Sequence, residues 1–259
     1  LIEPFGGSLA FTCEFAKKFP GVPIIVSDAL EPMILLWRHL RIQEVRSLID
    51  AYEREYQNRS QTLRKAWYYE IRDEYTKHAI QLPTLVDATL RERTLLAMSA
   101  MLFTMLRTCY NGLYRTSNVT GIFNTPAGFM QATKMHDAKM LDMFLAASKN
   151  WQISCRDYRQ SIVDIVAGAF SYLDPPYKDT YDGYCGKVGF DVRGLAPFIR
   201  DCKIKGAKQV FMSQGYDPDY WLAELPEASH LALSRRQGVN RNVESVGRPI
   251  VKEMLLMVS

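Results

Sequence analysis

The tetrapeptide Asp174-Pro175-Pro176-Tyr177 combines residue types that together suit one kind of ligand. It directly follows the apolar run 169–173, which is typical of a buried strand. The two prolines fix φ and lack N–H donors, so they leave a stiff turn with carbonyl acceptors. Such a turn suits a planar group that carries an exocyclic amine, with the amine donating to Asp174 and a prolyl carbonyl and the ring stacking on Tyr177. The alternative is an ordinary Pro-Pro turn after a strand.

A second candidate site lies at the start of the chain. Gly6 and Gly7 would let the backbone approach a ligand closely in a first strand-to-helix turn. Asp28 follows the apolar run 22–26, and an acid at that strand end is placed to accept hydrogen bonds from two ribose hydroxyls. The turn lacks a full G-x-G-x-x-G pattern, so it does not predict a dinucleotide site. Asp28 could instead cap the helix that follows it.

A third candidate is the loop 110–128, which places an aromatic ring, an amide and a guanidinium within six residues at Tyr110, Asn111 and Arg115. An aromatic side chain can enter a base stack, and arginine can read guanine with two hydrogen bonds. Residues 59–136 hold ten Lys and Arg against five acids, and residues 234–249 hold four Arg against one Glu. This charge distribution favours a polyanionic partner. A flexible polar loop and solvated helix faces are the alternatives.

The elements that must position these residues alternate between strand and helix at both ends of the chain. We expect a helix over 9–18, a strand at 22–26, a helix over 31–46, a strand at 169–173, a helix over 192–202, and strands at 209–212, 231–233 and 250–258. Amphipathic patterns around 63–75 and 98–106, and a helix over 137–148, separate the two parts. The sequence therefore predicts an α/β domain, residues 1–46 and 151–259, with a helical domain, residues 47–150, inserted into it.

The composition excludes several classes of protein. In 259 residues, 47% are hydrophobic and 23% charged, which excludes a disordered or fibrous chain. No window approaches the roughly 20 apolar residues of a membrane span, and the first residues do not read as a signal peptide. The five cysteines are widely spaced and form no C-x-x-C pair, which argues against a disulfide framework or a zinc site. We expect a soluble cytoplasmic protein without a membrane partner, and its oligomeric state stays open.

These motifs together resemble those of a known family. Asp174-Pro175-Pro176-Tyr177 resembles motif IV of S-adenosylmethionine-dependent amino-methyltransferases, and residues 3–8 resemble their motif I. The order of motif I, acid, helical insert and motif IV is that of the Dam-type (α-class) DNA adenine-N6 methyltransferases. Three segments, 68–72, 109–115 and 121–126, are similar to the target-recognition block of that class, and residues 155–158 are similar to the segment before its motif IV. The resemblance covers essentially the whole chain.

The resemblance implies a Rossmann-like methyltransferase sheet with an inserted helical target-recognition domain, S-adenosylmethionine as cofactor and double-stranded DNA as partner. It implies a catalytic set of Asp174, Pro175, Pro176 and Tyr177, and no metal. The cofactor-binding set that it implies is Glu3, Pro4, Phe5, Gly6, Gly7, Asp28, Asp157 and Tyr158. Its implied DNA-binding set is Tyr110, Asn111, Leu113, Arg115 and Pro126. Loop 178–190, with three glycines and Phe190, is expected to close over the flipped base.

The sequence departs from the family in two places. The family's Lys-Trp-x-Gly-Gly-Lys segment, normally some tens of residues before motif I, has no counterpart among these residues. Residues 127–130 replace a more basic and aromatic stretch of the recognition block, so the family's GATC site is one candidate and the recognition sequence stays open. Two other classes also remain: a related enzyme that acts on cytosine N4, RNA or a protein amide, and a non-catalytic DNA-binding relative.

Overall fold

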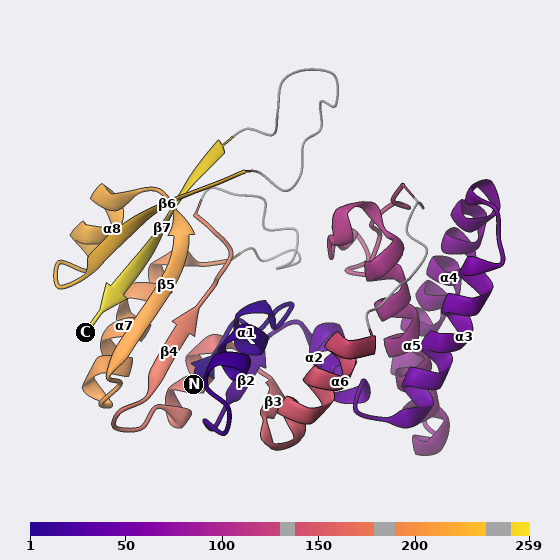
Figure 1. Ribbon diagram of the computed structural model, residues 1–259, viewed down its shortest axis with the longest axis horizontal. Helices are drawn as coiled ribbons and strands as arrows, with labels where there is room; N and C mark the ends of the chain where they lie inside the picture. The colour runs from indigo at the N-terminus through magenta and orange to yellow at the C-terminus, as the bar shows by residue number, and fades with distance from the viewer. Residues whose placement is uncertain (130–137, 179–189, 237–249) are drawn as a thin grey trace. The chain divides into compact units, whose positions relative to one another are not determined.

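The computed structural model describes residues 1–129, 138–178, 190–236 and 250–259 (Figure 1). The chain divides into two compact units. The sheet unit holds Leu1–Ala29 and the described parts of Asn150–Asp182 and Val188–Ser259. The helical unit holds the described parts of Leu30–Lys149.

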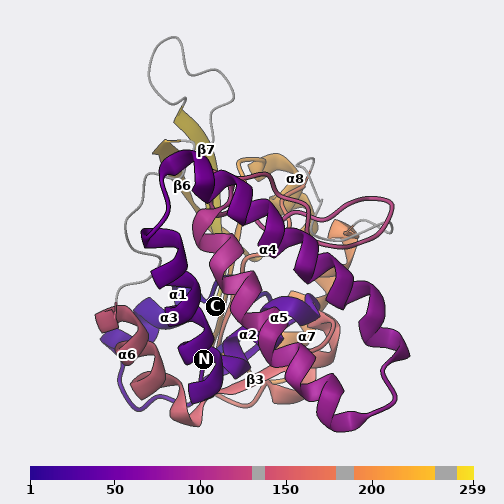
Figure 2. The same cartoon turned by 90° about the vertical axis from the view of Figure 1, so that its right-hand side faces the viewer.

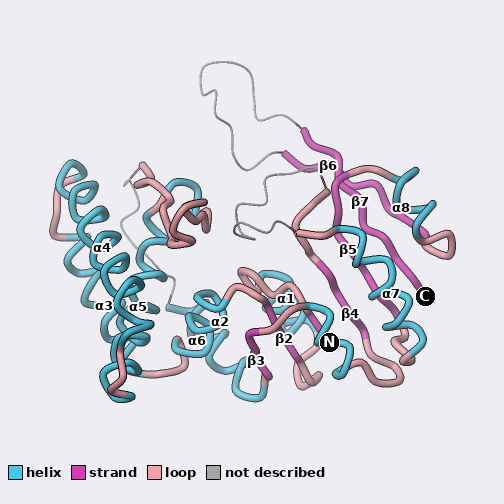
Figure 3. Tube along the Cα trace, turned by 180° about the vertical axis from the view of Figure 1, so that it is seen from behind, coloured by secondary structure: helices cyan, strands magenta, loops and turns pink. Residues whose placement is uncertain are grey.

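A seven-stranded sheet forms the centre of the sheet unit among the described residues, in the order β3-β2-β1-β4-β5-β7-β6. The first five strands in this order pair in parallel, while β7 is antiparallel to both β5 and β6. Figure 3 shows the strands side by side. The strands are β1 Ile2–Glu3, β2 Ile25–Asp28, β3 Gln152–Cys155, β4 Phe170–Leu173, β5 Gln209–Gly215, β6 Ser229–Arg236 and β7 Ile250–Val258.

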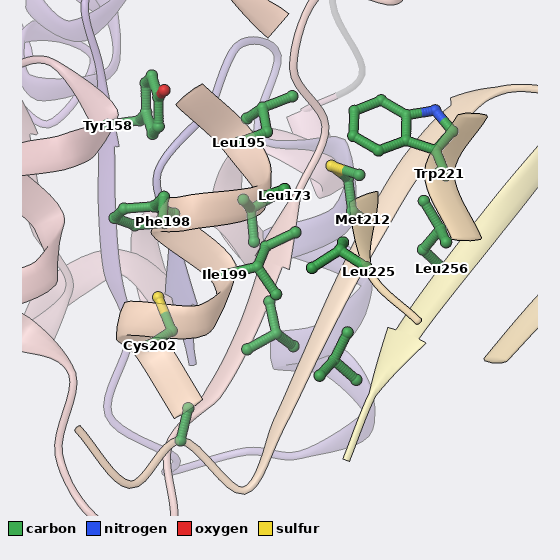
Figure 4. Close-up of a cluster of buried hydrophobic side chains, with 14 of the residues drawn as sticks. Tyr158, Leu173, Leu195, Phe198, Ile199, Cys202, Met212, Trp221, Leu225 and Leu256 are labelled. Carbon is green, nitrogen blue, oxygen red and sulfur yellow. The ribbon is translucent and has the colours of Figure 1, made fainter. Parts of the chain in front are cut away.

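Helices of the sheet unit connect these strands. They are α1 Ala10–Lys18, α7 Leu195–Ile204 and α8 Pro218–Glu224, with 3₁₀ segments η4 Tyr158–Asp164 and η6 Val192–Gly194. Leu173 of β4 and Met212 of β5 are buried in a cluster with Leu195, Ile199 and Trp221 from the helices (Figure 4). Each such side chain contributes about 1.5–3 kcal/mol by leaving water. This core fixes the strands whose carboxyl ends carry the candidate site.

The helical unit is built around one long helix, α5 Ala88–Thr108, which packs against three others (Figure 2). Asp87 caps its first turn by accepting from the Leu90 N–H at 2.7 Å, as an N-terminal carboxylate should. Its partners are α2 Glu31–His39, α3 Gln43–Gln57 and α4 Gln61–Gln81, and the unit also contains α6 Ala138–Ala147, η1 Leu82–Thr84, η2 Tyr110–Gly112 and η3 Ser148–Asn150.

The predicted fold class, a Rossmann-like methyltransferase sheet with mixed α/β order, is confirmed, but three elements differ from expectation. The single helix expected over 31–46 is wrong, because the chain turns at 40–42 and starts α3 at Gln43. The Arg46 guanidinium donates to the Leu40 carbonyl at 2.8 Å and so satisfies the end of α2. The short strand β3 and the helix α8 were not expected. No described helix is long and apolar enough to cross a membrane.

Candidate active site

The carboxyl ends of four neighbouring parallel strands bring most of the candidate residues to one edge of the sheet. Asp28 pairs in register with Cys155, two residues before Asp157. Ile2 pairs with Ser171, so the turn that starts after β1 lies beside the turn that starts after β4. In doubly wound sheets, ligands bind at this edge. The register therefore gathers the expected cofactor and catalytic segments within the sheet unit.

The turn after β1 is tightly built around its two glycines. The Gly6 N–H donates to the Ser27 carbonyl at 2.9 Å, and a Cβ atom on Gly6 would lie 2.4 Å from Cγ1 of Val26. Gly7 has φ +44°, in the left-handed region that favours glycine, and a Cβ added there would meet no atom within 4 Å. The turn is therefore closely packed against β2 at Gly6 and faces open space at Gly7.

Asp28 ties this turn to the end of β2. Its Oδ2 accepts a hydrogen bond from the Gly7 N–H at 2.8 Å. The helix that follows has Leu30 as its N-cap, without a side-chain cap bond, so the alternative of Asp28 as the N-cap of that helix is wrong. A carboxylate at this strand end is held where it can also accept from a ligand's hydroxyl groups.

Aromatic rings line the next part of the edge. The rings of Phe5 and Tyr158 stack with centroids 5.0 Å apart and an interplanar angle of 28°. Phe190 meets the Phe5 ring edge-on at 5.7 Å. Asp157 is the N-cap of η4 and accepts from the Arg159 guanidinium and backbone N–H, and these bonds hold the pKa of Asp157 below its usual range. The aromatic rings and this ionised carboxylate are suitable neighbours for a purine.

Glu3, at the end of β1, has a buried carboxyl group, with only 2% exposure. Oε2 accepts a hydrogen bond from the Thr12 hydroxyl of α1. Burial raises the pKa of Glu3 to about 8, and the nearby carboxylates of Asp174 and Asp28 act in the same direction, whereas the Thr12 bond acts against them. At neutral pH the folded protein therefore holds Glu3 mostly uncharged.

The turn 174–177 begins where β4 ends at Leu173. Asp174 is exposed and Pro175 is buried. Two residues of β5 that the sequence reasoning missed contact this turn. Ser213 Oγ lies 2.7 Å from Tyr177 Oη, and the Gln214 amide nitrogen donates to the Pro176 carbonyl at 3.5 Å. Their position directly after the expected strand 209–212 was the signal that could have found them.

The first-turn and strand-end residues fit the cofactor that the sequence suggests. The open outer side of Gly7, the carboxylate of Asp28 and the stacked Phe5 and Tyr158 rings offer a close backbone approach, a hydroxyl acceptor and an apolar surface. The carboxylates around them also suit a cationic sulfonium. Residues 179–189, which contain almost all of the segment expected to close over the base, lie outside the described residues.

The expected DNA-binding residues belong to a separate, hydrogen-bonded hairpin in the helical unit. The Tyr110 N–H donates to the Pro126 carbonyl at 2.9 Å, and the Asn124 N–H donates to the Arg115 carbonyl at 2.9 Å. Asn111 is exposed with φ +53°, so it stands at a sharp turn. The Leu113 carbonyl accepts from the Thr125 hydroxyl at 2.7 Å. All five predicted residues thus lie in one compact hairpin with its two ends joined.

Several basic residues of the segment 59–136 bind the protein itself. The Arg64 guanidinium lies 4.4 Å from the Tyr56 ring centroid and donates to the Tyr56 carbonyl. Arg72 donates to the carbonyls of Asn124 and Thr125 and so holds the hairpin against α4. Within the hairpin, Nε of Arg115 is buried and has no hydrogen-bond partner among the described residues. The second basic segment, 234–249, lies mostly outside the described residues.

Comparison with known proteins gives this arrangement its family. The profile of the D12 class N6 adenine-specific DNA methyltransferases matches residues 1–191, from the first turn through the helical insert to the turn 174–177. The chain belongs to this family. The predicted resemblance to adenine-N6 DNA methyltransferases is thereby confirmed, and so is S-adenosylmethionine as the methyl donor of this D12-class methyltransferase. The family acts on DNA.

Individual relatives agree with the family profile. The Type II methyltransferase M.MjaIII of Methanocaldococcus jannaschii is 30% identical over 236 residues, which cover 85% of this chain and 75% of the relative. The DNA adenine methylase of Serratia marcescens is 28% identical and covers 61% of this chain and 60% of its own length. The retron Ec67 DNA adenine methylase of Escherichia coli is 26% identical, and the match covers 71% of this chain and 57% of the relative. The chain thus spans less than two thirds of the second and third relatives.

Proposed function

We propose that this chain methylates N6 of an adenine that has been flipped out of duplex DNA, with Asp174, Pro175, Pro176 and Tyr177 as its catalytic set. The observation that carries the proposal is the register of β1 and β4, which sets the turn 174–177 beside the glycine turn of residues 4–7. An amine held at one turn then faces the ligand held at the other. Proximity of this kind supplies much of the rate in a two-substrate transfer.

The amine needs two acceptors because its lone pair is delocalised into the adenine ring. Hydrogen bonds from both amine hydrogens, to Asp174 and to a prolyl carbonyl, favour a pyramidal nitrogen with a localised lone pair. The Pro176 carbonyl already accepts from Gln214, so we assign the second acceptor to Pro175. The Tyr177 ring stacks on the base. The base must leave the duplex to reach this turn, at a cost of about a few kcal/mol.

The cofactor-binding role belongs to the residues of the neighbouring strand ends. S-adenosylmethionine supplies an electrophilic methyl group on a cationic sulfur. We assign Glu3, Pro4, Phe5, Gly6 and Gly7 to the methionine side of the ligand. Asp28 accepts from the ribose hydroxyls, and Asp157 and Tyr158 contact the adenine of the cofactor. These roles match the chemistry of an acceptor carboxylate at the end of β2 and a stacked aromatic pair.

Target recognition is assigned to the hairpin of the helical unit. The exposed Asn111 and the neighbouring Tyr110 lie in the sharp turn 110–112, beside the joined ends of the hairpin, where we expect an aromatic ring and an amide to enter a base stack. We assign Arg115, whose buried Nε has no hydrogen-bond partner among the described residues, to the reading of a base edge by its guanidinium. Leu113 and Pro126 complete the surface. GATC is the proposed recognition sequence, and it rests on the family resemblance of these residues.

The test is transfer of labelled methyl groups to unmethylated duplexes with and without GATC, followed by nucleoside analysis by mass spectrometry. We expect N6-methyladenine, with Asp174→Ala reducing transfer by far more than tenfold (about 1.4 kcal/mol) while S-adenosylmethionine binding persists. Asp201→Ala, the same change at an exposed carboxylate of α7, is the control. More than a tenth of wild-type turnover in Asp174→Ala would refute the role assigned to Asp174. Methylation of cytosine N4 or of RNA would refute adenine in duplex DNA as the substrate.

A further inference from the structure

Two residues at the end of β5 contact the turn 174–177, one from each face of the sheet. Ser213 and Gln214 are consecutive residues of β5, so their side chains leave opposite faces of the strand. Both are buried, with exposures of 8% and 0%. Their polar atoms are directed to the same short segment, Pro176 to Lys178, which therefore lies across the carboxyl end of β5.

Gln214 uses both ends of its amide. Its Oε1 accepts from the Lys178 N–H at 3.1 Å, and its Nε2 donates to the Pro176 carbonyl at 3.5 Å. On the other face, Ser213 Oγ lies 2.7 Å from Tyr177 Oη. The three consecutive residues Pro176 to Lys178 are thus fixed at three points. A buried amide is stable in such a site only when its polar atoms are bonded, so these contacts restrict the turn strongly.

Lys178 is also fixed through the charge of its side chain. The Lys178 ammonium forms an ion pair with Asp217 at 2.6 Å and lies 3.9 Å from the centroid of the Tyr220 ring. Asp217 in turn caps α8 by accepting from the Tyr220 N–H. The chain leaving the turn is therefore held by β5 and by the start of α8 together.

We propose that Ser213 and Gln214 are positioning residues for methyl transfer, a role that rests on the proposed function. Gln214 occupies the Pro176 carbonyl and so leaves Pro175 as the prolyl acceptor for the substrate amine. Ser213 holds the Tyr177 hydroxyl and so sets the plane of the ring on which the base stacks. Loss of either contact lets the turn shift, and a shift of about 1 Å at reacting groups costs on the order of a hundredfold in rate.

Gln214→Met tests the amide contacts, because methionine has a similar volume and removes both hydrogen bonds without opening a cavity. We expect the single-turnover rate constant for methyl transfer to fall about 10- to 100-fold, while the dissociation constant for S-adenosylmethionine changes less than about threefold. Gln209→Met makes the same change at the amino end of β5, away from the site, and is expected to match the wild type. Equal rates in Gln214→Met and the wild type would overturn the proposal.

Ser213→Ala and Tyr177→Phe test the second contact as a pair. Each removes one hydroxyl of the same hydrogen bond, and Ser213→Ala also removes a contact with the Tyr172 hydroxyl, so the double variant should lose clearly less rate than the product of the two single losses. Thr104→Ala is the control, because it removes a buried hydroxyl of α5 that bonds the Ala100 carbonyl, away from the sheet unit, and it is expected to match the wild type in rate. Independent, multiplicative effects of Ser213→Ala and Tyr177→Phe would show that the bond does not position the ring.

Amide hydrogen exchange separates this proposal from the proposed function. The Lys178 N–H should exchange slowly in the wild type and faster in Gln214→Met, whatever substrate the enzyme methylates. If the wild type methylates no adenine but Lys178 loses protection in the variant, the function fails and the contact stands. If the wild type methylates adenine and neither the exchange nor the rate changes in Gln214→Met, the positioning role fails alone.

Discussion

Replacing the buried carboxyl of Glu3 with an amide should change how stability depends on pH. Burial raises the pKa of Glu3 from 4.5 to about 8, so between these values the folded chain holds a proton that the unfolded chain has released. Stability from the neutral carboxyl is therefore fully present below pH 4.5 and is lost as pH rises toward about 8. Glu3→Gln keeps an acceptor for the Thr12 hydroxyl and cannot ionise.

The magnitude follows from the linkage between proton binding and folding. One proton held only by the folded state changes the free energy of unfolding by about 1.4 kcal/mol per pH unit. From about pH 6 to about pH 7.5, the wild type should lose about 2 kcal/mol relative to Glu3→Gln. This is a large part of the roughly 5–15 kcal/mol that stabilises a typical domain.

Urea unfolding of both proteins at several pH values measures this difference directly. Glu14→Gln, the same change at a carboxylate of α1 whose side chain is 71% exposed, serves as the control and should show no comparable slope against the wild type. A difference between wild type and Glu3→Gln that stays constant within about 0.5 kcal/mol over this pH range would refute the assignment of a neutral Glu3.

Two further predictions concern the ligands. Asp28→Ala should weaken S-adenosylmethionine binding, measured by calorimetry, by about 1–3 kcal/mol, because the ribose hydroxyls and the Gly7 N–H lose their acceptor. The affinity for DNA should stay the same. An unchanged dissociation constant for S-adenosylmethionine would mean that Asp28 only supports the turn. Arg115→Ala should change the relative preference for near-cognate duplexes by about 1–3 kcal/mol at one guanine. Lys65→Ala, at an exposed site of α4, should weaken binding of all duplexes alike and lower the salt dependence of binding. An unchanged order of preference in Arg115→Ala would mean that the hairpin contacts only the DNA backbone.

The sequence was informative wherever function depends on local order along the chain. The strand-to-turn transitions at residues 3–8, 28 and 173–174 are visible as apolar runs that end in glycine, acid or proline, and the structure places them at one edge of the sheet. Parallel pairing brings these turns together, because the carboxyl ends of parallel strands meet at the same edge of the sheet.

The sequence was uninformative wherever a residue's role depends on a distant partner. Asp28 could be a cap or a ligand acceptor on local grounds. In the structure Leu30 is the N-cap of α2, and Asp28 accepts from the Gly7 N–H, 21 residues away. Arg64 and Arg72 counted as charges for a polyanion, yet both donate to backbone carbonyls of the helical unit. The break after α2 has no glycine or proline to mark it, since residues 40–42 are Leu, Arg and Ile.

The proposed mechanism depends on three neighbouring strands, β1, β4 and β5, which together hold the short catalytic turn in place. β1 ends in the cofactor turn, β4 ends in the amine acceptors, and β5 supplies the side chains that hold those acceptors. Side chains alternate between faces along a strand, so a slip of one residue in β5 would turn Ser213 and Gln214 to the opposite faces of the sheet and break all three contacts. The buried alternate residues of β5, Val210 and Met212, oppose that slip because it would take them out of the hydrophobic core cluster. Core packing of β5 and geometry of the catalytic turn are therefore set by the same register.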